Sequence, residues 1–217
     1  KMIITDGVFS MDGDIAPLDK LYELGKEYNA LLMVDDAHST GVLGNGRGTA
    51  HHFGLTDVDV QLGTLSKALG SVGGYVAGRK ELIEYLVNYS RSFIFSTALS
   101  PADIGAALEA LTIVKNKPLV VEQLNENTAY MANKLQSMGI ECDDETPIFP
   151  IIVGDNERAL SLAYELELRG IIITAIRPPT VPVGESRLRM TVTAAHSQEQ
   201  LDYVANTLRD LLVDINI

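Results

Sequence analysis

The chain has 217 residues, of which 46% are hydrophobic and 21% charged, as is ordinary for a globular protein of one large or two small domains. Its net charge of -12 argues against nucleic acid as a partner, because nucleic-acid binding depends on cationic contacts to phosphate. No apolar run reaches the roughly 18 residues of a membrane span, and no signal peptide is recognised. Because Cys142 is the single cysteine, no internal disulfide can form, and we expect a reducing, cytoplasmic compartment.

The first half of the sequence alternates between strand and helix patterns. Short apolar runs predict strands at residues 1–5, 31–34, 58–62, 75–77 and 93–95. Apolar spacing predicts helices at residues 18–28, after Pro17, and at residues 80–89. This alternation is typical of an α/β fold, in which helices pack on the faces of a sheet. The wholly apolar run at 31–34 is typical of a buried parallel strand.

The second half begins with two predicted long helices and then changes character. The first helix covers residues 102–114 after Pro101, and the second covers residues 119–138 with Gly139 as its C-cap. The rest of the chain predicts strand, helix, strand, strand and helix at residues 148–153, 156–169, 171–175, 187–192 and 198–213.

Two domains are therefore expected, with a boundary near residue 105. Residues 1–105 would form part of a large α/β domain, and residues 106–217 would form bridging helices and a small α+β domain. Lys1 leads straight into a predicted strand, with no cap or turn before it. Such a start is unusual for a natural N-terminus, so we expect a fragment of a longer protein.

Lys67 carries more chemical information than any other residue of the chain. It lies in residues 63–70 (GTLSKALG), among hydroxyls and glycines that directly follow a predicted strand. A second polar cluster, residues 35–38 (DDAH), follows the strand predicted at 31–34. Side chains that follow strands of an open α/β sheet can converge on one cleft. A lysine with a carboxylate and an imidazole nearby indicates a Schiff-base site for pyridoxal 5′-phosphate (PLP).

The DDAH cluster has more than one interpretation. Asp35 would pair with the pyridine nitrogen of PLP; alternatively, Asp35 or Asp36 caps a helix or binds a metal together with His38. His38 would hydrogen-bond the phenolic oxygen of the cofactor or transfer protons, although a lone histidine is more often structural. Asp36 is expected to be a capping or supporting group. His51 and His52 are expected on the surface of a short helix.

Two further groups of polar residues are candidates for binding anions. Thr64 and Ser66 offer hydroxyls to a phosphate beside the backbone N–H groups of a glycine-rich turn, although ordinary turns contain the same residues. Arg187 and Arg189 alternate on a predicted strand, so both side chains point to the same face. A guanidinium suits bidentate binding of a carboxylate, and the alternative is a surface salt bridge.

Taken together, these motifs resemble the α-oxoamine synthases, a branch of the fold-type I PLP-dependent enzymes. The matching runs are residues 6–14, 34–38, 63–70 and 193–196, in family order and over nearly the whole chain. The resemblance implies the C-terminal part of an aspartate aminotransferase-like large domain, followed by a small α+β domain. Members of the family also have a longer N-terminal region, with a phosphate-binding glycine turn and a residue that stacks on the cofactor.

The resemblance also implies roles for individual residues. Lys67 would hold PLP, Asp35 would pair with its pyridine nitrogen, and Ser10 and His38 would contact its phenolic oxygen. Thr64 would bind the phosphate, and Ser66 remains the second hydroxyl that the local pattern offers to it. The catalytic residues would thus be Lys67, His38 and Asp35, with no metal.

Other roles implied by the resemblance concern the substrate and a second subunit. Arg189 would bind the carboxylate of an amino acid, with Thr180 as a further substrate contact. Ser96 and Thr97 would reach the phosphate bound in a neighbouring subunit, so a homodimer with shared active sites is expected.

The reaction implied is the decarboxylative condensation of an amino acid with an acyl thioester carried by CoA or a carrier protein. Residues 91–98 and 177–182 are most similar to the branch that uses L-alanine and a pimeloyl thioester in biotin biosynthesis. Residues 63–67 equally fit the branch that uses glycine and an acetyl thioester. A truncated chain without catalysis is the other alternative, and the joint presence of Lys67, Asp35 and His38 argues against it.

Overall fold

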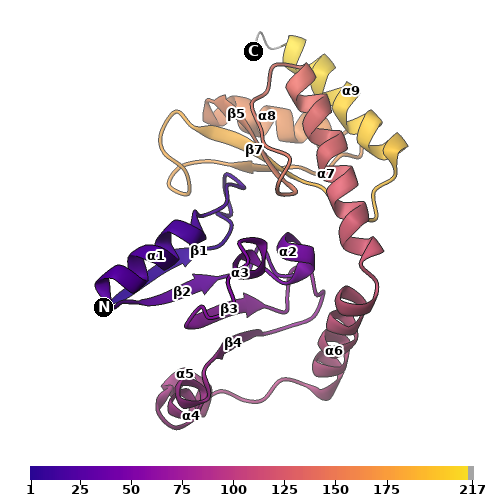
Figure 1. Cartoon of the computed structure of the whole chain (residues 1–217). Helices are drawn as coiled ribbons and strands as arrows, with labels where there is room; N and C mark the ends of the chain where they lie inside the picture. Colours follow the sequence, from indigo (N-terminus) through magenta and orange to yellow (C-terminus); the bar gives the residue numbers. More distant parts are fainter. Residues whose placement is uncertain (215–217) are drawn as a thin grey trace. The chain divides into compact units, whose positions relative to one another are not determined.

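The computed structural model describes residues 1–214, and the chain divides into two compact units (Figure 1). Unit 1 comprises Lys1–Phe9 and Ile15–Val121, and unit 2 comprises Ser10–Asp14 and the chain from Glu122 onward. The boundary expected near residue 105 lies inside helix α6 (Pro101–Asn116), earlier than the point at which these units divide. Within residues 1–214, no helix combines the length and apolar character needed to cross a membrane.

Unit 1 is built on a four-stranded sheet in the order β1–β2–β3–β4. Its strands are β1 (Met2–Asp6), β2 (Leu31–Asp35), β3 (Val60–Thr64) and β4 (Gly74–Gly78). The first three are parallel, and β4 runs antiparallel to β3. Because Asp6 pairs with Asp35 and Asp35 with Leu62, the carboxyl ends of the three parallel strands lie at one edge of the sheet.

The helices of unit 1 follow the predicted pattern closely. Besides α6, they are α1 (Leu18–Tyr28), α2 (Leu43–Gly46), α3 (Thr49–His52), α4 (Lys80–Tyr89) and α5 (Arg91–Ile94). The α1 and α4 bounds coincide with the prediction. Helix α6 begins where the Ser100 hydroxyl accepts a hydrogen bond from the Asp103 N–H, a common N-cap arrangement. His51 and His52 are exposed on α3, as predicted.

Unit 2 contains a three-stranded antiparallel sheet with β7 in the centre. Its elements are α7 (Leu119–Ser137, whose first residues belong to unit 1), β5 (Ile148–Gly154), α8 (Asn156–Glu167), β6 (Thr174–Ile176), β7 (Ser186–Thr191) and α9 (Gln198–Asp214). Asp155 is the N-cap of α8, and its carboxylate accepts hydrogen bonds from two backbone N–H groups in the first turn of the helix. Helix α8 contacts all three strands. A mixed α+β unit was predicted for this part of the chain.

Two strand predictions need correction. Residues 93–95 were predicted as a strand, but the chain is helical there: the N–H groups of Ile94 and Phe95 bond to the carbonyls of Ser90 and Arg91. A three-residue apolar run has no periodicity that separates strand from helix, so this prediction was wrong. Ile171 and Ile173 belong to the core of unit 2, but residues 171–173 do not join the ladder, and pairing with β7 starts only at Thr174.

Candidate active site

The loop after β3 presents Lys67, and its shape depends on hydroxyl groups. The Thr64 Oγ1 donates to the Gly73 carbonyl (3.0 Å) and accepts from the Ser66 N–H (3.1 Å). The Ser66 Oγ lies 2.7 Å from the Thr64 Oγ1. Because the Thr64 hydroxyl proton is used on Gly73, Ser66 is the donor in the bond between the two hydroxyls. The Thr64 hydroxyl therefore holds the turn together, as the ordinary-turn interpretation allowed.

Lys67 itself is exposed at the tip of this loop. The Gly70 N–H bonds to the Lys67 carbonyl (3.0 Å), and Gly70 has φ +60°, which a glycine adopts without strain. Among residues 1–214, no carboxylate forms an ion pair with Lys67. Its amine is therefore accessible to a ligand.

Asp35 ends β2 and lies at the same sheet edge as the Lys67 loop. It is half-buried, and its Oδ1 accepts the Ala37 N–H (2.9 Å). This bond fixes the carboxylate, and Oδ2 is the oxygen that a ligand nitrogen could reach. His38 follows one turn later and is half-buried.

Asp36 has a structural role in the same turn. It is buried, and its carboxylate accepts the Ser39 hydroxyl and the Thr49 N–H. A Cβ at Gly48 would lie 2.3 Å from the Asp36 Oδ2, so only glycine allows this approach. The supporting role predicted for Asp36 agrees with these contacts. Among residues 1–214, no group of three or more His, Cys, Asp or Glu side chains is arranged to hold a metal ion.

Asp6 is a further candidate, which the sequence patterns did not single out. It ends β1 directly opposite Asp35. Burial and the neighbouring Asp35 charge raise the pKa of Asp6, while Lys67 lowers it. Asp6, Asp35 and Lys67 therefore interact electrostatically at one edge of the sheet. The strand-end argument that identified Asp35 applies equally to Asp6.

Ser96 and Thr97 lie in an exposed stretch between α5 and α6. The stretch approaches the end of the Lys67 loop through Leu99, because a Cβ at Gly73 would lie 2.7 Å from the Leu99 Cδ1. Both side chains are accessible, so their expected contact with a neighbouring subunit stays a prediction.

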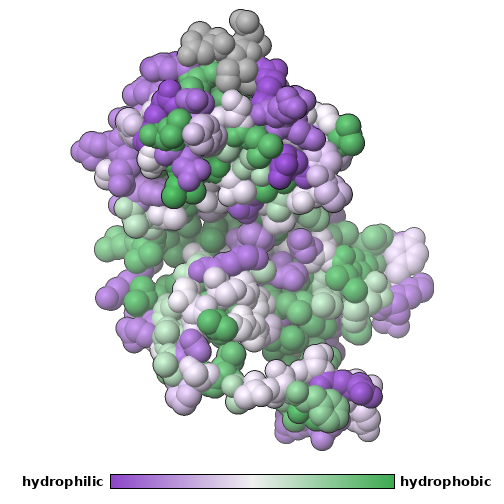
Figure 2. All heavy atoms as spheres, turned by 180° about the vertical axis from the view of Figure 1, so that it is seen from behind, coloured by the Kyte–Doolittle hydropathy of each residue, from purple (hydrophilic) through white to green (hydrophobic). Residues whose placement is uncertain are grey.

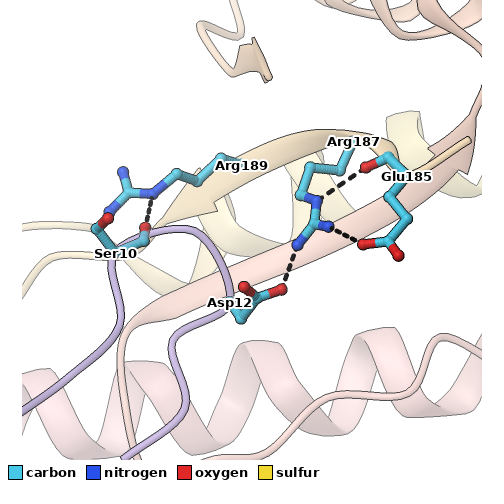
Figure 3. Close-up of polar contacts among 5 residues, drawn as sticks. All are labelled: Ser10, Asp12, Glu185, Arg187 and Arg189. Carbon is cyan, nitrogen blue, oxygen red and sulfur yellow. Dashed lines mark hydrogen bonds and ion pairs between the residues drawn. The ribbon is translucent and has the colours of Figure 1, made fainter. Parts of the chain in front are cut away.

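The remaining candidates belong to unit 2, where Arg187 and Arg189 contact the Ser10–Asp14 segment from the same face of β7 (Figure 3). Arg187 is buried and pairs with Asp12 and Glu185. Arg189 is half-buried, and its Nε donates to the Ser10 carbonyl. Burial lowers the pKa of Arg189.

The two arginines therefore differ in what they offer a ligand. Within residues 1–214, no carboxylate pairs with Arg189, whereas Arg187 has two. Arg187 forms salt bridges, though from a buried position and not on the surface as the alternative had it, and the ligand role of Arg189 stays a prediction. Thr180 is exposed, and its N–H bonds to the Arg177 carbonyl (3.1 Å) in a turn.

The predicted site residues fall into two sets, one in each unit. Unit 1 holds Asp35, His38, Thr64, Ser66, Lys67, Ser96 and Thr97, and unit 2 holds Ser10, Thr180 and Arg189.

Comparison with known proteins identifies the family. The family model described as aminotransferase class I and II matches residues 1–208. The chain belongs to this family. The 8-amino-7-oxononanoate synthase of Lysinibacillus sphaericus is 51% identical over 220 residues, which cover 100% of this chain and 57% of the relative. The chain spans a little more than half the length of such curated relatives.

Solved structures agree with this assignment. A structure of serine palmitoyltransferase with PLP has a TM-score of 0.95 and 30% identity, and the match covers 99% of this chain and 55% of that one. The 8-amino-7-oxononanoate synthase of Francisella tularensis has a TM-score of 0.86 and 30% identity, covering 100% of this chain and 64% of that one. The resemblance to the α-oxoamine synthases and the predicted fold class are confirmed.

Proposed function

We propose that this chain is part of an 8-amino-7-oxononanoate synthase. Such a PLP-dependent acyltransferase condenses L-alanine with a pimeloyl thioester and releases carbon dioxide and CoA or a carrier protein, in biotin biosynthesis. Relatives with that name match along the whole chain at about half identity, which supports the proposal. The structural observation that carries it is the strand register: Asp6 and Asp35 end neighbouring parallel strands at the sheet edge where β3 leads into the Lys67 loop.

The residues at this edge fit PLP. Lys67 offers an exposed amine without a carboxylate partner among residues 1–214, and Asp35 offers a carboxylate fixed through its Oδ1. When bound, PLP supplies an electron sink for the charge that develops at the α-carbon of the amino acid. Lys67 Nζ would hold the cofactor covalently, and its amine can carry a proton. Asp35 would keep the pyridine nitrogen protonated, because a nearby negative charge favours the charged form of that nitrogen.

The other predicted contacts have local support. Ser66 has an exposed hydroxyl beside the N–H groups of the Lys67 loop, which suits a phosphate. Thr64 would contribute through the turn that it holds. His38 and Ser10 keep the roles that the family resemblance implies, at the phenolic oxygen.

Arg189 is the proposed ligand of the amino-acid carboxylate. Its guanidinium is partly desolvated, which disfavours the charge unless an anion compensates it. Its Nε is engaged by the Ser10 carbonyl, so Nη1 and Nη2 remain for a bidentate carboxylate.

The first experiment is a visible absorption spectrum of the chain with added PLP, followed by titration with L-alanine and, separately, with glycine. We expect a Schiff-base band that Lys67→Ala abolishes and that L-alanine perturbs at lower concentration than glycine does. Lys80→Ala, which removes another exposed lysine of unit 1, is the matched control and should keep the band. A band that survives in Lys67→Ala would refute the lysine assignment.

Preference for one amino acid decides the branch. Perturbation mainly by glycine would favour glycine C-acetyltransferase (2-amino-3-ketobutyrate CoA ligase), whose motif is also matched by residues 63–67.

Asp35→Asn should cut turnover severely with a modest loss of PLP binding, because it weakens the electron sink. An unchanged turnover rate would make Asp35 a structural residue.

A cytoplasmic homodimer is the further part of the proposal. The exposed stretch with Ser96 and Thr97 is available for contact with a second subunit. Sedimentation velocity over a range of protein concentrations tests the dimer, and a monomer at every concentration would contradict it.

A further inference from the structure

The Ser10–Asp14 segment is attached to a sheet that lies far from it in the sequence. Asp12 pairs with Arg187 of β7, and the Ser10 carbonyl accepts from the Arg189 Nε (Figure 3). The buried Thr146 hydroxyl donates to the Gly13 carbonyl (2.7 Å). Three contacts therefore hold this five-residue segment, and each contact joins residues that are more than 130 positions apart in the sequence.

Arg187 directs all three of its side-chain nitrogens at protein groups. Its side chain is 2% exposed. The Nε donates to the Glu185 carbonyl (3.0 Å), the Nη2 to the Glu185 carboxylate (3.0 Å), and the Nη1 to the Asp12 carboxylate. Each of the three guanidinium nitrogens thus has a protein acceptor, and the side chain is almost fully buried. Of its partners, Asp12 alone belongs to the Ser10–Asp14 segment.

Arg189 depends on the same segment for its orientation. Its Nε donates to the Ser10 carbonyl, which lies two residues before Asp12. Within residues 1–214, Ser10 is the one hydrogen-bond partner of the Arg189 side chain. If the segment were displaced, the Arg189 guanidinium would lose its hydrogen bond to the Ser10 carbonyl, and its Nη1 and Nη2 would no longer be held in one orientation.

We propose that Arg187 is a positioning residue: through Asp12 it fixes the Ser10–Asp14 segment, and the Ser10 carbonyl then orients Arg189 toward an α-carboxylate. The last link rests on the proposed function, because it assumes an amino-acid substrate. The first link concerns only unit 2 and can be tested without a substrate.

The competing explanation is that Arg187 needs only a neutralising charge, with no effect on Arg189. Asp12→Asn removes the carboxylate that reaches the segment, and Asp12 is 54% exposed, so the variant should fold. Asp14→Asn is the matched control, because Asp14 is an exposed aspartate of the same segment without an ion pair among residues 1–214. Glu185→Gln is the second control: it removes a carboxylate of Arg187 that does not touch the segment.

Two measurements follow on the PLP-loaded chain and its variants. Amide hydrogen exchange reports on residues 10–14, and PLP absorbance gives apparent dissociation constants for L-alanine and for ethylamine, which is L-alanine without its carboxylate. We expect Asp12→Asn to speed exchange about tenfold and to weaken L-alanine about tenfold, as loss of one charged contact would. Ethylamine should change less than about twofold, and so should both amines in the two control variants.

A double variant tests the route through Arg189. In an Arg189→Gln background, Asp12→Asn should cause no further loss of L-alanine affinity, because the group that it positions is gone. Equal losses for L-alanine and ethylamine, additive losses in the double variant, or the same exchange in Asp12→Asn and Asp14→Asn would each overturn the proposal.

Failure of the proposed function gives a different result. If the unaltered chain responds to neither amine, the substrate assignment is wrong and the link from Arg189 to a carboxylate falls with it. Hydrogen exchange of residues 10–14 then tests by itself whether Arg187 fixes the segment through Asp12. Faster exchange in Asp12→Asn alone upholds the fixing of the segment, and unchanged exchange refutes it.

Discussion

The two compact units place their apolar residues differently. In unit 2, nineteen buried hydrophobic residues among those described form one cluster between its helices and sheet. The corresponding cluster of unit 1 has five: Leu18, Leu32, Val34, Ala50 and Val58. Unit 1 instead leaves large apolar side chains exposed on α4, α5 and α6, including Tyr85, Tyr89, Phe93 and Leu108, and directly after α5, at Phe95. Figure 2 shows hydrophobic residues (green) exposed on the surface among hydrophilic ones (purple).

The difference indicates how stability is distributed. Burial of apolar surface is the main favourable term in folding, at about 25 cal/mol per Å². Unit 2 can therefore draw on a core of its own, whereas unit 1 has less apolar burial to offset its conformational entropy. We expect the sheet of unit 2 to be the more protected against hydrogen exchange, and the following substitutions test this comparison.

The largest expected effect is in the core of unit 2. Phe149 is fully buried in β5 and belongs to the large cluster. Phe149→Ala should lower the free energy of unfolding by about 3–5 kcal/mol, because it removes buried surface and leaves a cavity. Urea unfolding followed by circular dichroism measures it. Ile172→Ala, at a residue 90% exposed in the same unit, should change stability by less than about 0.5 kcal/mol.

A smaller loss is expected in unit 1. Leu32 is 2% exposed in the central part of β2, within the five-residue cluster. Leu32→Ala should cost about 2–3 kcal/mol, at the lower end for such changes, because fewer buried neighbours surround the cavity. Its neighbour Leu31 is 48% exposed, and Leu31→Ala serves as the control. A Leu32→Ala cost equal to that of Phe149→Ala would remove the contrast between the units.

Hydrogen exchange separates the two substitutions further. Leu32→Ala should reduce protection in the sheet of unit 1 and leave β5 and β7 protected, if the units open separately. Equal loss of protection in both sheets would mean that the chain unfolds as one cooperative unit.

Local signals in the sequence were sufficient for most of the fold. The helices at Leu18–Tyr28 and Lys80–Tyr89 were predicted at their observed bounds, because apolar spacing and flanking Pro and Gly residues act over a few residues. The strand ends carrying Asp35 and Lys67 followed from the same patterns. Asp6 was overlooked although it ends β1 in the same way, because no lysine or histidine follows it closely.

Contacts across long sequence separations could not be predicted. Nothing in residues 10–14 indicates that Asp12 pairs with Arg187 or that Gly13 packs against β5. The different use of Arg187 and Arg189, two residues apart on one strand, likewise depends on this distant segment. Pairing of this kind is set by tertiary packing, which one sequence read locally does not contain.

An intermediate effect is expected where unit 2 holds the distant segment by a neutral hydrogen bond. Thr146→Val keeps the size of the side chain but leaves the Gly13 carbonyl without its donor. The expected cost is about 1–2 kcal/mol, because the group left unsatisfied is buried. Thr174→Val, at an exposed threonine of β6, should change stability by less than about 0.5 kcal/mol. Equal stability of the two variants in urea unfolding would show that the Gly13 contact contributes nothing.

The smallest effect concerns Asp6, Asp35 and Lys67 of unit 1. Unlike Arg187 of unit 2, they form no ion pair among residues 1–214. Asp6 is an exposed residue, but partial desolvation of its carboxyl group and the Asp35 charge raise its pKa, and Lys67 opposes them, so native Asp6 keeps its proton to a higher pH than the unfolded chain does. Between the unfolded and native pKa values the native state binds more protons, and this contribution to stability falls as pH rises. Asp6→Asn has no such titration.

The stability of Asp6→Asn relative to the unaltered chain should therefore rise with pH through that interval and level off above it. The gain should stay below about 1 kcal/mol, because Asp6 is exposed and solvent screens its interaction with Asp35. Urea unfolding from about pH 3 to about pH 7 measures this difference. A flat difference for Asp6→Asn would mean that the three charges at the unit 1 sheet edge are screened from one another.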